Sequence, residues 1–305
     1  MKKMVITVAL VAQFGFVGGV YGATTGDSAV NTLTNIHYYA DFEKMDPFAQ
    51  QRCTISLRYP EKASYTNYPT VVWFHGGGLR PPQTHNAQFN NRLPERFGQA
   101  TVNYRCFDEN DGKVTADQIL EDAAAATAWV MKHIAEYGGD PKRVYVSGSS
   151  AGGYLSLIVG MNAELLAAHG VKNTDLAGVI SCSGQAATHF NIKKHSGDPR
   201  FSNDKGCRFL EYVDKYAPMY YCAAQELPPI VALVGESPWE WPTRAAENRL
   251  FIESLRALGH KQAWYISLPY VNHARTSVTT PAYIELFIDG RFPEPLENTM
   301  SPDVR

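Results

Sequence analysis

Five residues, Gly148-Ser149-Ser150-Ala151-Gly152, constrain the fold of this 305-residue chain more than any other segment. They form a Gly-x-Ser-x-Gly pattern between a β-branched run, Arg143 to Val146, and a stretch of small and apolar residues typical of a helix. A strand that turns into a helix within one residue exposes the central side chain, and the flanking glycines leave room for the turn. The pattern therefore predicts that Ser150 lies at the carboxyl edge of a β-sheet, with Ala151 opening the next helix.

A second glycine-rich segment follows a fully apolar run, Thr70 to Phe74, which has the pattern of a buried parallel strand. This run ends in His75-Gly76-Gly77-Gly78. Because glycine carries no side chain, the backbone N–H groups of such a loop can turn toward a ligand. We expect the amides of Gly77, Gly78 and Ala151 to form an oxyanion hole, a site that stabilises negative charge developing on oxygen.

The two motifs, in this order, resemble those of the α/β-hydrolase superfamily and, within it, the esterases related to hormone-sensitive lipase and the feruloyl and acetyl esterases. The resemblance covers roughly Gln51 to Phe292. It implies an α/β class fold: a mostly parallel eight-stranded sheet with helices on both faces and a cap insertion after the sixth strand, at about residues 184–224. It also implies that Ser150 is a nucleophile that attacks a carboxylic ester.

A serine nucleophile needs a general base, which in this fold is a histidine that follows the acid near the end of the chain. Of the nine histidines, only His273 follows a strand pattern, Ala263 to Leu268, in a loop before a final helix. We therefore expect His273 to be the general base.

Two carboxylates follow the strand pattern from Pro229 to Val234 and are candidates for the acid, namely Glu236 and Glu240. In the family the acid is usually an aspartate about three residues after the glycine that ends this strand, and this sequence departs from both features. Glu236 resembles the polar residue that ties down the turn. Glu240 lies between Trp239 and Trp241, a partly dry setting, so we favour Glu240 and keep Glu236 as the alternative.

Residues of the cap insertion and of the two motifs are expected to contact the substrate. The expected contacts are His75, Arg80, Ser149 and His189, with His85 and Asn86 as further candidates for the wall of the site. The insertion mixes aromatic and cationic side chains, which favours a polar, sugar-bearing or aromatic acyl ester over a long lipid chain.

The N-terminus has the pattern of a signal peptide, with a basic start, an apolar stretch and small residues before a cleavage point after Gly22. We expect residues 1–22 to be the leader of an exported protein, residues 23–305 to form one domain, and about 293–305 to be a loose tail. After removal of the leader we expect no stable membrane insertion. The chain has 28 Lys and Arg against 30 Asp and Glu, without a basic stripe, so nucleic acid is not an expected partner. No metal-ligand spacing is present and no cofactor is expected; the oligomeric state stays open.

Five cysteines in an exported chain leave at least one unpaired, and we expect this to be Cys182, at the end of a buried strand. In the α/β-hydrolase fold the second strand runs antiparallel beside the fourth, which brings Cys53 toward Cys106. Cys207 and Cys222 both belong to the cap and would close a loop of about 15 residues. Both pairings are hypotheses, because spacing alone does not determine connectivity.

Three function classes are compatible with these patterns. The first is a secreted serine carboxylesterase acting on a small-acyl or carbohydrate-linked ester. The second is an amide-cleaving relative, similar to aminopeptidases or arylformamidases, because the same residues serve amides. The third is a non-catalytic binding protein on the same fold, against which stand Ser150, His273 and the unbroken glycine motif.

Overall fold

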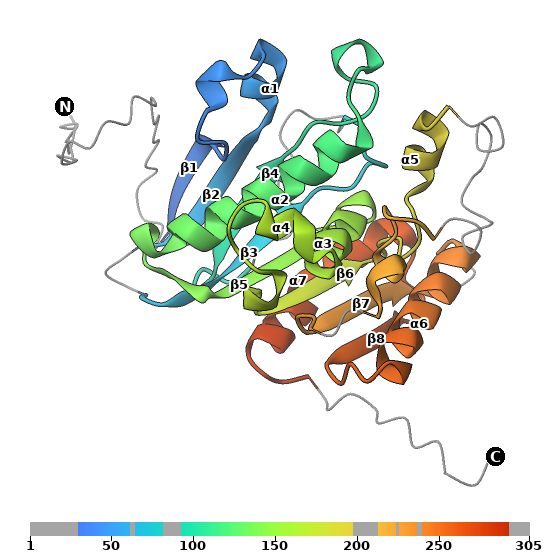
Figure 1. Cartoon of the computed structure of the whole chain (residues 1–305). Helices are drawn as coiled ribbons and strands as arrows, with labels where there is room; N and C mark the ends of the chain where they lie inside the picture. Colours follow the sequence, from blue (N-terminus) through green and yellow to red (C-terminus); the bar gives the residue numbers. More distant parts are fainter. Residues whose placement is uncertain are drawn as a thin grey trace, which may run out of the picture.

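A single eight-stranded sheet forms the centre of the molecule, which we describe from a computed structural model covering residues 30–61, 65–81, 93–197, 213–223, 226–236 and 240–292. The strand order is β1-β2-β4-β3-β5-β6-β7-β8 (Figure 1). β2 pairs antiparallel with β1 and with β4, and the remaining neighbours pair in parallel. The strands are β1 (Val30–His37), β2 (Thr54–Pro60), β3 (Tyr68–Phe74), β4 (Gly98–Asn103), β5 (Gly139–Ser149), β6 (Gly178–Cys182), β7 (Ile230–Gly235) and β8 (Ala263–Leu268). The expected mostly parallel sheet is confirmed.

Helices cover both faces of the sheet. The α-helices are α1 (Pro47–Arg52), α2 (Ala116–His133), α3 (Ala151–Met161), α4 (Ala163–Ala167), α5 (Phe190–His195), α6 (Pro242–Ala257) and α7 (His273–Ile288). The 3₁₀ turns are η1 (Phe42–Lys44), η2 (Asn110–Gly112), η3 (Ile134–Tyr137), η4 (Asn173–Asp175) and η7 (Pro218–Tyr221). α2 and α3 lie in front of the sheet in Figure 1, and the red α7 lies behind it.

The apolar strands separate two cores, because successive side chains of a strand point to opposite faces. In β3, Val72 and Phe74 belong to the core that also contains residues of α2, α3 and α6, whereas Val71 and Trp73 belong to the core that contains residues of α7. This two-sided burial explains why β3 and β7 read as continuous apolar runs in the sequence.

The boundaries of several elements differ from the expectation for physical reasons. β2 starts at Thr54 because the residues before it form the short helix α1, whose N-cap Asp46 accepts a hydrogen bond from the Ala49 amide at 3.0 Å. β1 had no counterpart in the sequence analysis; its polar residues become a strand by pairing with β2. His273 is the first residue of α7 rather than a loop residue.

Helix α2 follows its sequence signals. Thr115 and Gln118 form a capping box at its start, and the helical segment continues through η3 to Gly138, whose φ of 96° is a left-handed stop. The chain then enters β5 at once, at Gly139, and this strand leads to Ser150.

The predicted disulfide between Cys53 and Cys106 is wrong, because both are free, buried thiols. The Cys106 thiol donates to the Tyr104 carbonyl at 3.5 Å and lies 3.7 Å from Nη2 of Arg52, while the Cys53 thiol lies against Tyr38. Burial raises the pKa of each thiol to about 12.

The other cysteine predictions have separate outcomes. Cys222 is a free thiol, which contradicts its expected bridge, and its expected partner Cys207 lies outside the described residues. The prediction that Cys182 is an unpaired buried thiol is confirmed. The expected leader, the expected tail, His85 and Asn86 also lie outside the described residues. Within the described ranges, none of the helices is long and apolar enough to cross a bilayer.

A buried ion pair joins α2 to the segment after β4. Arg105 donates to both carboxylate oxygens of Asp122, at 2.6 and 2.9 Å, and the Arg105 amide donates to the same carboxylate at 2.8 Å. The Tyr39 hydroxyl supplies a further hydrogen bond at 2.7 Å. These hydrogen bonds and the Arg105 charge offset the free-energy cost of burying the Asp122 carboxylate, which is fully buried.

We therefore expect Asp122→Asn to lower the free energy of unfolding by about 3–5 kcal/mol, because it leaves the buried Arg105 guanidinium without a countercharge. Urea denaturation measures this change. The control is Asp111→Asn, whose carboxylate is exposed and 3.8 Å from Lys113, and which should leave the urea midpoint unchanged. Equal midpoints for the two variants would contradict the prediction.

Candidate active site

Ser150 lies at a sharp turn between β5 and α3. Its φ of 56° and ψ of −115° place it in a backbone region that residues with a side chain rarely adopt. The turn is held by two backbone hydrogen bonds, from the Ser150 amide to the Cys182 carbonyl at 2.8 Å and from the Tyr154 amide to the Ser150 carbonyl at 2.9 Å. As the sequence motif predicts, the hydroxyl stands at the carboxyl edge of the sheet.

The two glycines of the motif are required by close packing. A Cβ atom on Gly152 would overlap the carbonyl oxygen of Phe74, and one on Gly148 would overlap the backbone of Gly152. Because these two residues are glycines, α3 can start directly against β3 and β5, and the turn from strand to helix at Ser150 is correspondingly tight.

Three side chains from the carboxyl ends of three strands form a hydrogen-bonded chain at this turn. Ser150 Oγ lies 2.9 Å from His273 Nε2, and His273 Nδ1 lies 2.8 Å from Glu240 Oε1. An ionised carboxylate only accepts, so Nδ1 carries the proton and donates it to Glu240, which leaves Nε2 free to accept from the Ser150 hydroxyl. Such an arrangement can remove a proton from a hydroxyl that attacks a carbonyl.

The Glu240 side chain is fully buried and carries several hydrogen bonds. Burial alone would raise its pKa, but hydrogen bonds and charge from His273, the Ser183 hydroxyl at 2.7 Å and the Trp241 amide at 2.9 Å outweigh it. The net effect lowers the pKa of Glu240, so the carboxylate is ionised at neutral pH.

Glu236, the alternative acid, has a different position. Its Oε1 accepts from the Ser267 hydroxyl at 2.5 Å, and its amide donates to the Leu268 carbonyl at 3.3 Å. These contacts tie the end of β7 to the end of β8. Of the two carboxylates considered in the sequence, the one that contacts His273 is Glu240.

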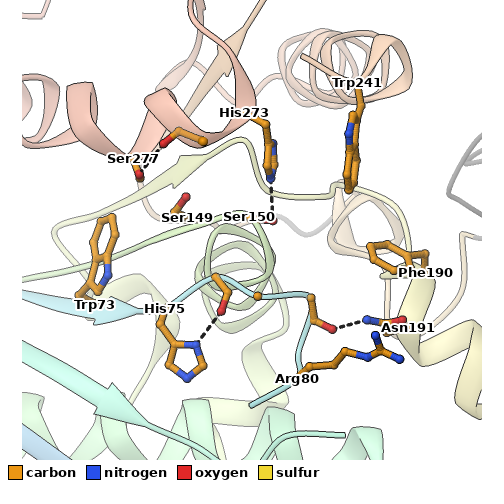
Figure 2. Close-up of a pocket in the computed structure, with 14 residues that line it drawn as sticks. Trp73, His75, Arg80, Ser149, Ser150, Phe190, Asn191, Trp241, His273 and Ser277 are labelled. Atoms are coloured by element: carbon orange, nitrogen blue, oxygen red, sulfur yellow. Dashed lines mark hydrogen bonds between the residues drawn. The ribbon is translucent and has the colours of Figure 1, made fainter. Parts of the chain in front are cut away.

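The glycine loop after β3 faces Ser150 across a cavity. Gly77 and Gly78 have φ values of 107° and 71°, backbone conformations that glycine adopts more easily than residues with a side chain. The side-chain amide Nδ2 of Asn191, in α5, donates to the Gly78 carbonyl (Figure 2). Gly77 and Gly78 line the cavity, and Ala151 opens α3 directly after Ser150, fully buried.

His75 supports this loop from below. Its ring stacks on Tyr104, with ring centroids 4.2 Å apart, and its Nδ1 bonds to the Gly76 carbonyl at 2.7 Å. Burial lowers the pKa of His75 to about 4, so the ring is neutral and Nδ1 carries the donated proton. His75 therefore positions the backbone of the loop in addition to forming part of the cavity wall.

The cavity has a volume of about 550 Å³, and both Ser150 and His273 line it (Figure 2). Its walls combine aromatic rings, hydroxyls and the glycine loop. The lining residues are Trp73, His75, Gly76, Gly77, Gly78, Arg80, Ser149, Ser150, Phe190, Asn191, Trp241, His273, Ala274 and Ser277. The Trp241 ring lies parallel to the His273 ring, with centroids 5.0 Å apart, and so covers one face of the imidazole.

The expected substrate contacts separate into two groups. His75, Arg80 and Ser149 line the cavity, and Arg80 is also paired with Asp108 at 2.9 Å. His189 does not line the cavity, which corrects its expected role as a substrate contact. It is buried under the start of α5, where its Nδ1 accepts from the Asn191 amide at 3.1 Å and burial holds its pKa well below the usual range.

Phe190, Asn191, Trp241 and Ser277 were absent from the sequence-based site. For Trp241 a signal existed, since it is adjacent to Glu240. Phe190 and Asn191 follow His189 in an insertion whose local pattern does not indicate which face meets the cavity. Among the residues that the structure describes, no three His, Cys, Asp or Glu side chains gather as metal ligands would.

The sheet and the site together define the class of protein, an α/β-hydrolase of the esterase and lipase branch. The sequence model of the BD-FAE family matches residues 56–237, more than half of the chain. The chain belongs to this family.

Individual relatives agree with this assignment. Esterase LipQ of Mycobacterium tuberculosis is 27% identical over 234 residues, which cover 71% of this chain and 52% of LipQ. Carboxylesterase NlhH of the same organism is 36% identical over 101 residues, 32% of this chain and 30% of NlhH. The chain thus aligns with about half the length of LipQ and less of NlhH.

Two solved esterase structures are similar in fold to this chain. Esterase B of Lactobacillus rhamnosis superposes with a TM-score of 0.63 at 19% identity, covering 87% of this chain and 88% of the esterase. Est2, an esterase of Thermogutta terrifontis, superposes with a TM-score of 0.57 at 20% identity, covering 83% and 90% of the two chains. At these identities the likeness establishes the fold.

Proposed function

We propose that the chain is a serine carboxylic ester hydrolase, with Ser150 as nucleophile, His273 as general base and Glu240 as the acid that orients the imidazole. The observation that carries this proposal is the hydrogen-bonded chain of these three side chains, which ends at the floor of a cavity faced by the Gly76–Gly78 loop. The esterase relatives support the same reaction.

The reaction follows from the geometry. Ser150 Oγ attacks the ester carbonyl carbon while His273 Nε2 takes the hydroxyl proton. The negative charge that forms on the carbonyl oxygen is stabilised by the amides of Gly77, Gly78 and Ala151. His273 then donates its proton to the departing alcohol, and a water molecule activated by the same imidazole releases the acid from Ser150. Glu240 stays ionised and stabilises the imidazolium.

The proposed substrate is a short-acyl ester attached to a carbohydrate. Aromatic rings and polar side chains both line the cavity beside the reacting residues, a combination that suits the apolar faces and the hydroxyl groups of a sugar. The residues concerned are Trp73, Phe190 and Trp241, with Arg80, Asn191 and Ser277.

We expect Ser150→Ala and His273→Ala each to lower kcat for p-nitrophenyl acetate by on the order of 10⁴-fold, because the three residues act as a unit. Glu240→Gln should lower kcat far more than Glu236→Gln, its matched control, since Glu236 contacts Ser267 instead of His273. Wild-type activity in Ser150→Ala would refute the proposal, and the reverse order of the two glutamate variants would assign the acid to Glu236.

For the substrate class, Phe190→Ala should raise KM for an acetylated oligosaccharide by roughly tenfold, while KM for p-nitrophenyl acetate changes little, because in the proposed complex the aromatic ring on the cavity wall stacks on the sugar. Tyr220→Ala is the control, since Tyr220 belongs to the same insertion but is exposed and does not line the cavity. Equal KM changes for both substrates, or a preference of the wild type for an aminoacyl anilide, would contradict the assignment.

We also infer that the protein is exported, which the basic start and apolar stretch of residues 1–22 support. N-terminal sequencing of the protein from the periplasm or the medium should then begin at Ala23. Full-length protein retained inside the cell would contradict this inference.

A further inference from the structure

Each oxygen of the buried Glu240 carboxylate has its own fixed donor besides His273. The Trp241 amide donates to Oε1 at 2.9 Å, and the Ser183 hydroxyl donates to Oε2 at 2.7 Å. His273 Nδ1 lies 2.8 Å from Oε1 and 3.1 Å from Oε2. With both oxygens held, the plane of the carboxylate is determined, and with it the direction in which Oε1 meets the imidazole.

Ser183 is itself held in an unusual position. Its φ is 46°, a left-handed value that costs energy for a residue with a Cβ. Its amide donates to the Leu233 carbonyl of β7 at 2.7 Å, and its carbonyl accepts from the Arg244 guanidinium of α6. Because the side chain is fully buried and both backbone groups are bonded, the hydroxyl points at Glu240 without rotating into solvent.

The segment Cys182–Gly184 also contacts the nucleophile turn. The Cys182 carbonyl accepts from the Ser150 amide at 2.8 Å. Gly184 packs so closely on Gly153 of α3 that a Cβ would overlap its backbone. The segment Cys182–Gly184 therefore contacts the Ser150 turn on one side and Glu240 on the other. These contacts fix the distance between Ser150 and Glu240, the two residues that His273 joins.

Several charged or titratable groups face Glu240 from the elements packed around it. His273 comes from α7, Arg244 and Glu247 from α6, and Cys182 from β6. Arg244 and Glu247 lie 3.0 Å apart and are both buried, so they form an ion pair that is removed from the carboxylate's own hydrogen bonds. Ser183, like His273, contacts the carboxylate directly, but its hydroxyl does not titrate.

We propose that Ser183 is a positioning residue that orients the ionised Glu240 carboxylate toward His273, and that the Cys182–Gly184 segment couples this orientation to the Ser150 turn. The kinetic consequence rests on the proposed ester hydrolase function. The structural consequence, a hydrogen bond specific to the charged form of Glu240, does not.

The kinetic test is Ser183→Ala. Without the hydroxyl the Glu240–His273 pair holds a proton more tightly, so the acidic limb of the pH profile of kcat/KM should move up by about one pH unit. kcat for p-nitrophenyl acetate should fall about tenfold at neutral pH, as expected for loss of a hydrogen bond to a charged group. KM should stay the same, since Ser183 does not line the cavity.

Ser147→Ala is the matched control, because Ser147 is equally buried and its hydroxyl donates to the Ile180 carbonyl at 2.7 Å rather than to a carboxylate. It should leave the pH profile unchanged. Ser183→Gly removes the same hydroxyl while accommodating the positive φ, and it carries the test if the alanine variant does not fold. An unshifted profile in the Ser183 variants, or the same shift in Ser147→Ala, overturns the proposal.

A second measurement does not depend on activity. The lowered pKa of Glu240 stabilises the fold above the ordinary glutamate pKa of 4.5, and this contribution is lost as the pH falls through the lower folded-state value. Ser183→Ala should therefore destabilise the protein more at pH 7 than at pH 4 in urea denaturation, whereas the Ser147→Ala difference should be constant. A pH-independent difference for Ser183→Ala overturns the proposal even if the protein proves inactive on esters.

Discussion

The close contact between α3 and the strands β3 and β5 is the constraint on which the site depends. Gly148 and Gly152 leave no space for a Cβ, so the chain reverses from strand to helix across Ser150 alone. The strain at this residue, of order 1–3 kcal/mol, persists because α3 is buried along its whole length. Packing of an ordinary apolar helix thus holds one half-buried hydroxyl in a fixed position at the cavity.

Parallel strands bring the remaining groups to the same edge. The carboxyl ends of β5, β7 and β8 lead to Ser150, Glu240 and His273, which lie 123 and 33 residues apart along the chain in their two contacts. A buried carboxylate at this edge is tolerated because donors surround it, and the lowered pKa of Glu240 records that compensation. Ser183 is one of these donors, and we therefore infer that it supports the role of Glu240 in the proposed reaction.

The sequence predicted the parts of the site that local chemistry dictates. Ser150 and the glycine loop were identifiable because the turn and the close approach each require glycine, and His273 because it follows a strand in the expected order. His189 and the Cys53–Cys106 bridge were wrong for a shared reason. Burial and side-chain direction at those positions depend on neighbours distant in sequence, such as α5 over the cavity and Tyr38 against Cys53.

By itself the sequence determined the strand that leads to Ser150, the sharp turn at this residue and the loop at Gly76–Gly78, since apolar runs and glycine requirements act over a few residues. The sequence favoured Glu240 over Glu236, and the tertiary structure shows that Glu240 is the one that contacts His273. The tertiary structure alone decided that Trp241 covers the imidazole and that Ser183 holds the carboxylate. These contacts depend on the alignment of β6, β7 and β8 and on where α6 and α7 begin after the strands. This alignment is a property of the packed sheet, and no local sequence pattern encodes it.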